Sequence, residues 1–171
     1  MKKIKLFSLE LQRFARSKNA LRGHFIQAFT PGTPTAPKAA DATWLELAKW
    51  IATVDDDTDE ETDDTGFYDG DGTPEKTVVS VSKGYSFEGF YDPEDKAQAL
   101  VSDMQLKIGD GRKVWHKVVS ADGTKTWIGL ATVTDIVTGS GDATEFEAFE
   151  CTITFNQIPE ETKGAAKAAG K

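Results

Sequence analysis

Cysteine and histidine are scarce in this chain. Cys151 is the one cysteine, and His24 and His116 are the two histidines. A single cysteine excludes an internal disulfide framework and any cysteine-rich zinc site. No run approaches the roughly 18 consecutive apolar residues of a membrane-spanning helix. Because two histidines offer little material for catalysis, composition argues against most enzyme classes, and we expect no catalytic residue, no cofactor and no metal.

Common catalytic and ligand-binding motifs are also missing. The sequence contains no Gly-x-Ser-x-Gly, no phosphate-binding glycine loop, no Cys-x-x-Cys and no His-Glu-x-x-His. The acidic residues around position 60 invite a calcium loop, which needs glycine at its sixth position. Frames that begin at Asp55 or Asp59 place Glu60 or Asp64 there. Only a weak, adventitious cation site is compatible with this pattern.

The remaining candidate groups are better explained by structure than by chemistry. His116 alternates with Val114 and Val118 and is interpreted as a partly buried histidine in a strand. Cys151 lies in an apolar strand row and is interpreted as a small core residue. The four tryptophans are spread over separate segments, so core packing is the more common use, and a sugar-stacking platform is the alternative.

The alternation of apolar and polar residues predicts a mainly β protein. At 171 residues, 39% of them hydrophobic, the chain is globular and long enough for about one domain. Strands are expected at 20–30, 77–91, 113–120, 126–137 and 144–156. One helix is expected at about 93–106, because Asp92-Pro93 provides an N-cap and a first helical position. Residues 43–51 fit a short capped helix, with an extended conformation as the alternative.

Three strands carry specific predictions about their faces. In 20–30, Leu21, Phe25 and Phe29 share one face, with His24 on the other. The strand 126–137 is apolar on both faces, which suggests that another subunit covers one of them. In 144–156 the alternation changes phase, so we expect a bulge near residues 148–149 or a second covered face.

Charge is distributed very unevenly. Residues 1–40 carry net charge +7 and the remainder −15. A basic arm of this kind either binds an acidic neighbour, including another copy of the chain, or is simply solvated. The run 55–71 holds ten acids and no Lys or Arg, so 55–76 is expected to be an exposed, mobile acidic loop. The expected organisation is a basic arm or leader at 1–19, a single β domain at 20–159 and a flexible tail at 160–171.

Several short motifs follow one another along the chain in a characteristic order. They are Phe67-Tyr68-Asp69-Gly70, Ser86-Phe87-Glu88-Gly89, the helix start Asp92–Asp95, a Val-Val-Ser-Ala-Asp-Gly hairpin, Gly139-Ser140-Gly141-Asp142-Ala143-Thr144 and Phe155-Asn156-Gln157-Ile158-Pro159-Glu160. Their order and spacing, over about residues 20–160, resemble those of the major tail proteins, or tail tube proteins, of long non-contractile-tailed phages of Gram-positive bacteria. The start, Leu11-Gln12-Arg13-Phe14-Ala15, is also similar to leaders of structural proteins from such phages.

This resemblance implies a structural, non-catalytic protein of the virion. Such proteins have a β-sandwich or barrel-like core with one flanking helix and form hexameric rings. The rings stack into a tube around the tape-measure protein, and DNA passes through the lumen during ejection without specific binding. The implied partners are further copies of the chain, the tape-measure protein and the tail terminator or distal tail proteins. No membrane is implied, and the protein would be made in the bacterial host cytoplasm.

Charge then suggests where contacts lie in such a tube. An acidic lumen repels phosphates and lets DNA slide. The candidate lumen or inter-ring acids are Asp55, Asp56, Asp57, Asp59, Glu60, Glu61, Asp63, Asp64, Glu145 and Glu147. The candidate inter-ring arm residues are Lys2, Lys3, Lys5, Arg13, Arg16, Lys18 and Arg22. A carbohydrate- or receptor-binding β-sandwich module of a phage or cell-surface protein is the alternative function.

Overall fold

The computed structural model describes residues 18–32, 35–41 and 43–163 and has a mainly β architecture with one α-helix. The elements are η1 (Asn19–Leu21), β1 (Gly23–Ala28), β2 (Leu45–Glu46), β3 (Ile51–Asp56), β4 (Asp59–Asp63), β5 (Thr77–Ser82), β6 (Gly84–Phe90), α1 (Lys96–Ser102), η2 (Gly109–Arg112), β7 (Lys113–Val119), β8 (Lys125–Ser140), β9 (Ala148–Phe155) and β10 (Glu160–Lys163). Among the described residues no helix is long and apolar enough to cross a membrane.

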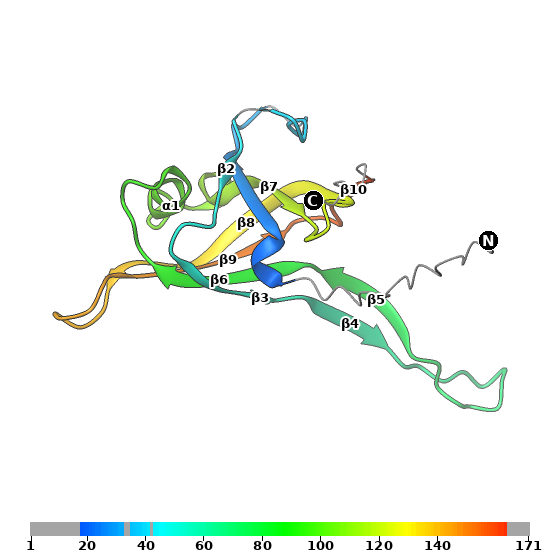
Figure 1. Cartoon of the computed structure of the whole chain (residues 1–171). Coiled ribbons are helices and arrows are strands. Elements are labelled where there is room, and N and C mark those ends of the chain that lie inside the picture. The colour runs from blue at the N-terminus through cyan, green and yellow to red at the C-terminus, as the bar shows by residue number, and fades with distance from the viewer. Residues whose placement is uncertain (1–17, 33–34, 42, 164–171) are drawn as a thin grey trace, which may run out of the picture.

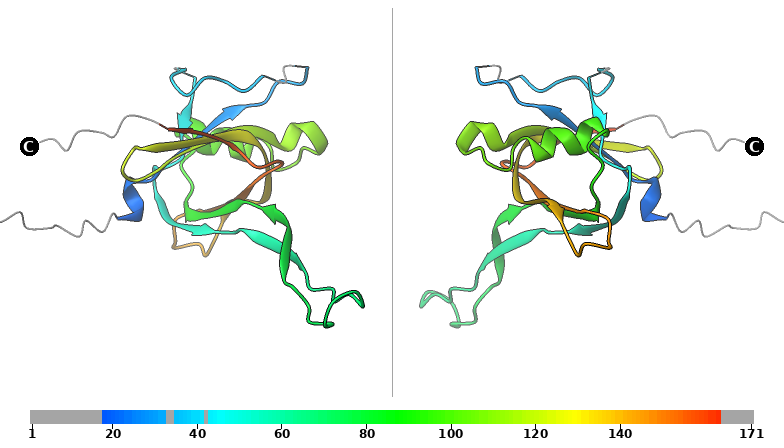
Figure 2. Two further views of the ribbon diagram at one scale, coloured as in Figure 1. Left: turned by 90° about the vertical axis from the view of Figure 1, so that its right-hand side faces the viewer. Right: turned by 90° about the vertical axis from the view of Figure 1, so that its left-hand side faces the viewer.

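Eight strands form one curled antiparallel sheet, seen from three sides in Figures 1 and 2. The strand order is β2-β1-β7-β8-β9-β6-β3, and β10 pairs with the first part of β8. The expected mainly β fold with one flanking helix is confirmed. A second, two-stranded sheet, β4-β5, continues the β3-β6 pair outward as a hairpin.

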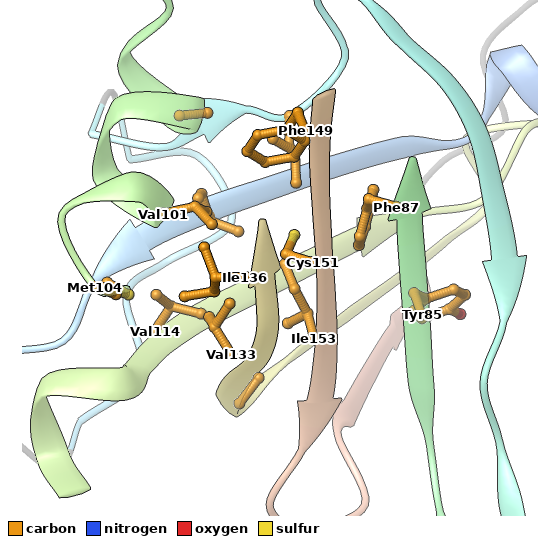
Figure 3. Close-up of a cluster of buried hydrophobic side chains, with 14 of the residues drawn as sticks. Tyr85, Phe87, Val101, Met104, Val114, Val133, Ile136, Phe149, Cys151 and Ile153 are labelled. Carbon is orange, nitrogen blue, oxygen red and sulfur yellow. The ribbon is translucent and has the colours of Figure 1, made fainter. Parts of the chain in front are cut away.

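The core fills the concave side of the curled sheet beneath α1 (Figure 3). In β9 the inward row Phe149, Cys151, Ile153 and Phe155 is buried, as the alternation predicted. The expected bulge is also present, but the extra residue sits in the partner strand, because Gly139 of β8 lies opposite the 148–149 step. At Gly139 φ is +78°, a conformation that glycine adopts without steric cost.

The helix is shorter than predicted. Its N-cap is Asp95, whose side chain accepts hydrogen bonds from the backbone of Ala97 at 3.0 Å and Gln98 at 2.9 Å. Asp92 instead opens a turn, because its carbonyl accepts from the Asp95 backbone and its own N–H donates to Gln98 Oε1. After Ser102 the chain continues in turns, so the predicted span 93–106 was too long at both ends.

In β1 Phe25 and His24 lie on opposite faces, as expected, and the buried side chains are His24 and Ile26. Three local expectations were wrong. Residues 43–51 form β2, a turn and the first residue of β3 rather than a helix, in agreement with the extended alternative. Part of the acidic loop is strand β4, and the predicted strand 77–91 divides into β5 and β6 at Lys83.

The beginning of the predicted flexible tail is also ordered. Residues 160–163 form β10, in which Glu161 lies opposite Trp127 and bonds both the Trp127 indole and Lys125. The rest of the predicted tail, 164–171, and nearly all of the predicted arm lie outside the described residues. The division into arm, domain and tail therefore stays a prediction.

The middle of β8 was expected to be buried on both faces, and only one of its faces carries fully buried side chains in the structure. Ala131 and Val133 are buried, whereas Ile128 and Leu130 on the other face are half-buried. These two side chains line a surface cavity that also includes Trp115 and Ile158. Cover by another subunit on this face stays a prediction.

Candidate assembly surfaces

The β4-β5 hairpin projects from the body of the protein and buries none of its residues (Figures 1 and 2). Val78, Val79 and Val81 are 51%, 57% and 42% exposed. An isolated two-stranded ribbon is at best marginally stable in water. A hairpin that exposes three valines is therefore a surface suited to contact with another polypeptide.

The strand register separates the hairpin into two chemically different faces. Glu60 lies opposite Val81 and Thr62 opposite Val78, so these four side chains share one face, which we call the valine face. Asp59 and Glu61 lie opposite serines on the other face, where Ser80 Oγ donates to Glu61 Oε2 at 3.3 Å. Val79 is the extra residue of a β-bulge, because Glu61 lies opposite Ser80 and the next residue, Thr62, lies opposite Val78.

The acidic candidates lie mainly along this hairpin. Asp55 and Asp56 end β3, Asp57 follows it, and the others lie on β4 or directly after it: Asp59, Glu60, Glu61, Asp63 and Asp64. Asp56 pairs with Lys83, and this hydrogen bond, with a smaller one from Thr58, holds the Asp56 pKa below its usual value. Every one of these acids is exposed, as a solvated or partner-facing surface requires.

Glu145 and Glu147 do not join this group. They lie in the loop before β9 rather than on a shared strand face, which corrects the sequence-based placement. The Glu147 carbonyl accepts from the Tyr91 backbone at 2.8 Å, beyond the end of β6 farthest from the hairpin. Figure 1 shows the β8–β9 loop and the hairpin at opposite ends of the sheet. The two acidic sets therefore form separate surfaces.

The basic candidates can be placed only in part. Lys18 and Arg22 flank η1, and the other five lie outside the described residues. Asn19 Nδ2 donates to the Val54 carbonyl of β3 at 3.2 Å, which fixes where the N-terminal segment meets the body. Arg22 borders a cavity of about 580 Å³ at the base of the hairpin, together with Val81, Tyr85 and Trp127.

Two histidines meet in the core, a feature that sequence reasoning missed. His24 Nδ1 and His116 Nε2 are 3.4 Å apart, and the other ring nitrogen of each has no partner among the described residues. The rings of Tyr85 and Phe87 stand edge-on to His24, and Phe155 stacks on His116. The feature that brings the two histidines together is the pairing of β1 with β7, in which His24 lies opposite Val118 and Ile26 lies opposite His116.

Burial keeps both rings neutral. Desolvation, with a smaller contribution from Arg22, lowers the His24 pKa to about 4. Desolvation followed by the charge of His24 lowers the His116 pKa well below its ordinary value. Within the described residues no group of three His, Cys, Asp or Glu side chains is arranged to hold a metal ion. Cys151 is buried, and burial raises its thiol pKa to about 12.

The tryptophans do not form an exposed platform in the described part of the chain. Trp115 is buried, and Trp44 and Trp127 are half-buried, with indole N–H groups that donate to the Lys38 carbonyl and to Glu161. Trp50 is 62% exposed. A row of coplanar stacking rings is therefore not assembled.

Comparison with known proteins defines the fold of the chain. No protein-family model and no curated protein sequence matches it. Solved structures do match. The tail of an empty gene transfer agent particle with C6 symmetry aligns at TM-score 0.59 and 17% identity, covering 86% of this chain and 99% of that one.

Two further structures carry the same fold. The SPP1 tail tube aligns at TM-score 0.55 and 13% identity, covering 89% of this chain and 81% of that one. The sheath-tube complex of the PVC extracellular contractile injection system aligns at TM-score 0.51 and 14% identity, covering 89% and 95%. The chain therefore has the fold found in tail tubes, which occurs in contractile and other systems alike.

Proposed function

We propose that this chain is a structural, self-assembling subunit of the tail tube of a phage with a long, non-contractile tail that infects Gram-positive bacteria. The observation that carries the proposal is the match to a gene transfer agent tail along 86% of this chain and 99% of that chain. The described residues hold no arranged metal-binding group. We propose a role in assembly without catalysis.

Sheet edges give the geometric basis for a ring. The curled sheet ends at β2 on one side and at β3 on the other. Unpaired edge strands template association with another chain. We propose that subunits join in hexameric rings, in which neighbouring sheets continue one another into an inner barrel. A head-to-tail contact of this kind closes when the rotation between subunits fits.

Contacts between rings require elements that leave the body of the subunit. The hairpin does so, and we assign it to the contact with the next ring, together with the basic residues of the N-terminal segment. Rings stacked in this way propagate without closing and give a tube. Tape-measure and terminator or distal tail proteins would then be its partners inside the tube and at its ends.

The acidic surfaces fit passage of DNA. A phosphate backbone is attracted to Lys and Arg clusters and is repelled by carboxylates. We propose that Glu145 and Glu147, or the acids of the hairpin, face the lumen and keep DNA from adhering as it passes. The two sets lie at opposite ends of the sheet, so they are separate candidates for this role.

Electron microscopy of the purified chain over a range of concentrations, with light scattering on the same samples, tests this function. Rings or hollow tubes are expected. A strictly monomeric protein whose tryptophan fluorescence responds to a sugar would overturn the proposal in favour of a carbohydrate-binding module. No observation in the described residues favours that alternative, because the tryptophans form no exposed platform.

A further inference from the structure

The valine face of the hairpin has no cover within the described residues. Val78 and Val81 are 51% and 42% exposed and share this face with Glu60 and Thr62. The face continues the inner surface of β6, on which Tyr85 and Phe87 are buried. An apolar strip that runs outward from the core invites association unless something covers it in the free subunit.

The N-terminal segment starts close to this face. Residues 1–17 precede η1, and Asn19 is bonded to the Val54 carbonyl of β3. The next element after β3 is β4, and the Asp57 N–H still bonds the Gly84 carbonyl between the two strand pairs. Seventeen extended residues reach at most about 60 Å, whereas the five residues of β4 span about 17 Å. The segment is long enough to follow the hairpin from its base.

A cavity connects the two features. Its lining includes Arg22, near the start of the described chain, and Val81 of the valine face. Tyr85, Trp127 and Ile158 supply apolar walls between them. The cavity gives apolar side chains of an incoming segment a place to pack at the base of the hairpin.

Charge and composition match the segment to the face. Residues 1–17 hold five basic residues and one acid, for a net charge of +4, and six large apolar residues: Ile4, Leu6, Phe7, Leu9, Leu11 and Phe14. The hairpin region 55–71 holds ten acids and no Lys or Arg. Opposite charges attract and steer the encounter, and a segment that combines apolar side chains with a net positive charge suits a face of valines with one central carboxylate.

We propose that, in the free subunit, residues 1–17 pack along the valine face of the β4-β5 hairpin of the same chain. This contact covers Val78 and Val81 before any assembly, and it stands independently of the tube function. When subunits associate, the same contact can be exchanged between copies, as in domain swapping.

Paired cysteine variants of the full chain test the contact. Phe7→Cys is combined with Val81→Cys on the valine face or, as the control, with Ser80→Cys on the opposite face; Phe14→Cys replaces Phe7→Cys in a second set. Oxidation is carried out at a concentration where light scattering reports a monomer. A disulfide needs Cβ atoms about 3.5–4.5 Å apart. Cys151 does not compete, because it is buried and its thiol pKa is about 12.

The expected result is an intramolecular disulfide that forms at least about tenfold more readily with Val81→Cys than with Ser80→Cys, because the contact raises the effective thiol concentration. Glu60→Lys should lower the yield, and the matched change Glu61→Lys, on the opposite face, should not. Equal yields from the two faces, or a disulfide found only in dimers, would overturn the proposal. Tube formation is scored separately on unoxidised protein, so the two proposals fail independently.

Discussion

The buried histidine pair predicts that the protein loses stability between pH 7 and pH 5. In the unfolded chain a histidine has a pKa near 6.5, whereas His24 in the fold has a pKa of about 4. Because the folded pKa is depressed, the stabilising contribution is present above pH 6.5 and is lost as pH falls toward 4. The unfolded state takes up the proton first, and that uptake favours unfolding.

The size of the loss follows from the shift. Linkage gives about 1.4 kcal/mol for each pH unit over which only the unfolded state is protonated. For His24 this amounts to about 2 kcal/mol of unfolding free energy between pH 7 and pH 5. His116 adds to the loss in the same direction, because burial depresses its pKa as well. The carboxyl groups whose pKa the fold lowers, among them Asp56, Asp92 and Glu161, lose their stabilising contribution mainly below this window, because carboxyl groups of an unfolded chain titrate near pH 4.

Urea denaturation at pH 7, 6 and 5 measures the effect at a protein concentration where the chain is monomeric. The comparison is the double variant His24→Phe with His116→Phe, which keeps two rings in the aromatic cluster and removes both titrating groups. The wild type should lose at least about 2 kcal/mol by pH 5, and the variant should lose much less. The same loss in both proteins would refute the reasoning; if the double variant does not fold, each single variant should show part of the reduction.

Three further predictions concern the hairpin tip, a close backbone approach and the helix cap. Tyr68→Ser at the fully exposed tip should leave the melting temperature unchanged and raise the concentration at which light scattering reports assembly; a shifted melting curve would contradict this. Gly89→Ala should cost about 2–4 kcal/mol in urea denaturation, because a Cβ there would stand 2.2 Å from the Trp50 carbonyl oxygen; a neutral variant would contradict it. Asp95→Ala should cost about 1 kcal/mol, because two backbone N–H groups lose their acceptor, and an unchanged chemical denaturation midpoint would count against the cap.

Much of the sheet could be predicted from sequence because its strands bury one face. The row from Phe149 to Phe155 alternates with polar residues, and this pattern has only one arrangement that hides its apolar side. The turn at residues 121–124 was also predictable, because Ala-Asp-Gly-Thr carries turn residues between two apolar runs.

The prediction failed where tertiary pairing overrides local pattern. The pairing with β7 determines which face of β1 is buried, and it places His24 and Ile26 on the core side of the sheet. Single-strand periodicity separated the phenylalanine face from the His24 face, but it gave no sign of which face is buried or that a neutral histidine pair forms the core there. Phe25 instead lies under Lys117, with Nζ 4.3 Å from the ring centroid.

The candidate acidic surfaces could likewise be predicted only in part. The acidic run was recognised from charge alone, but repulsion among its carboxylates suggested a loop, whereas β5 supplies a partner strand of valines and serines. The separation of Glu145 and Glu147 from the hairpin could not be predicted from spacing, because it depends on the direction in which β6 and β9 run past each other.

The symmetry of the assembled particle tests the central claim most directly. Purified full-length chain is concentrated, and end-on views of the particles are classified by electron microscopy. The tail-tube account predicts closed rings with six-fold symmetry that stack into hollow tubes as concentration rises. A protein that stays monomeric at every concentration and binds a sugar, or one that forms rings of another symmetry that never stack, would contradict it.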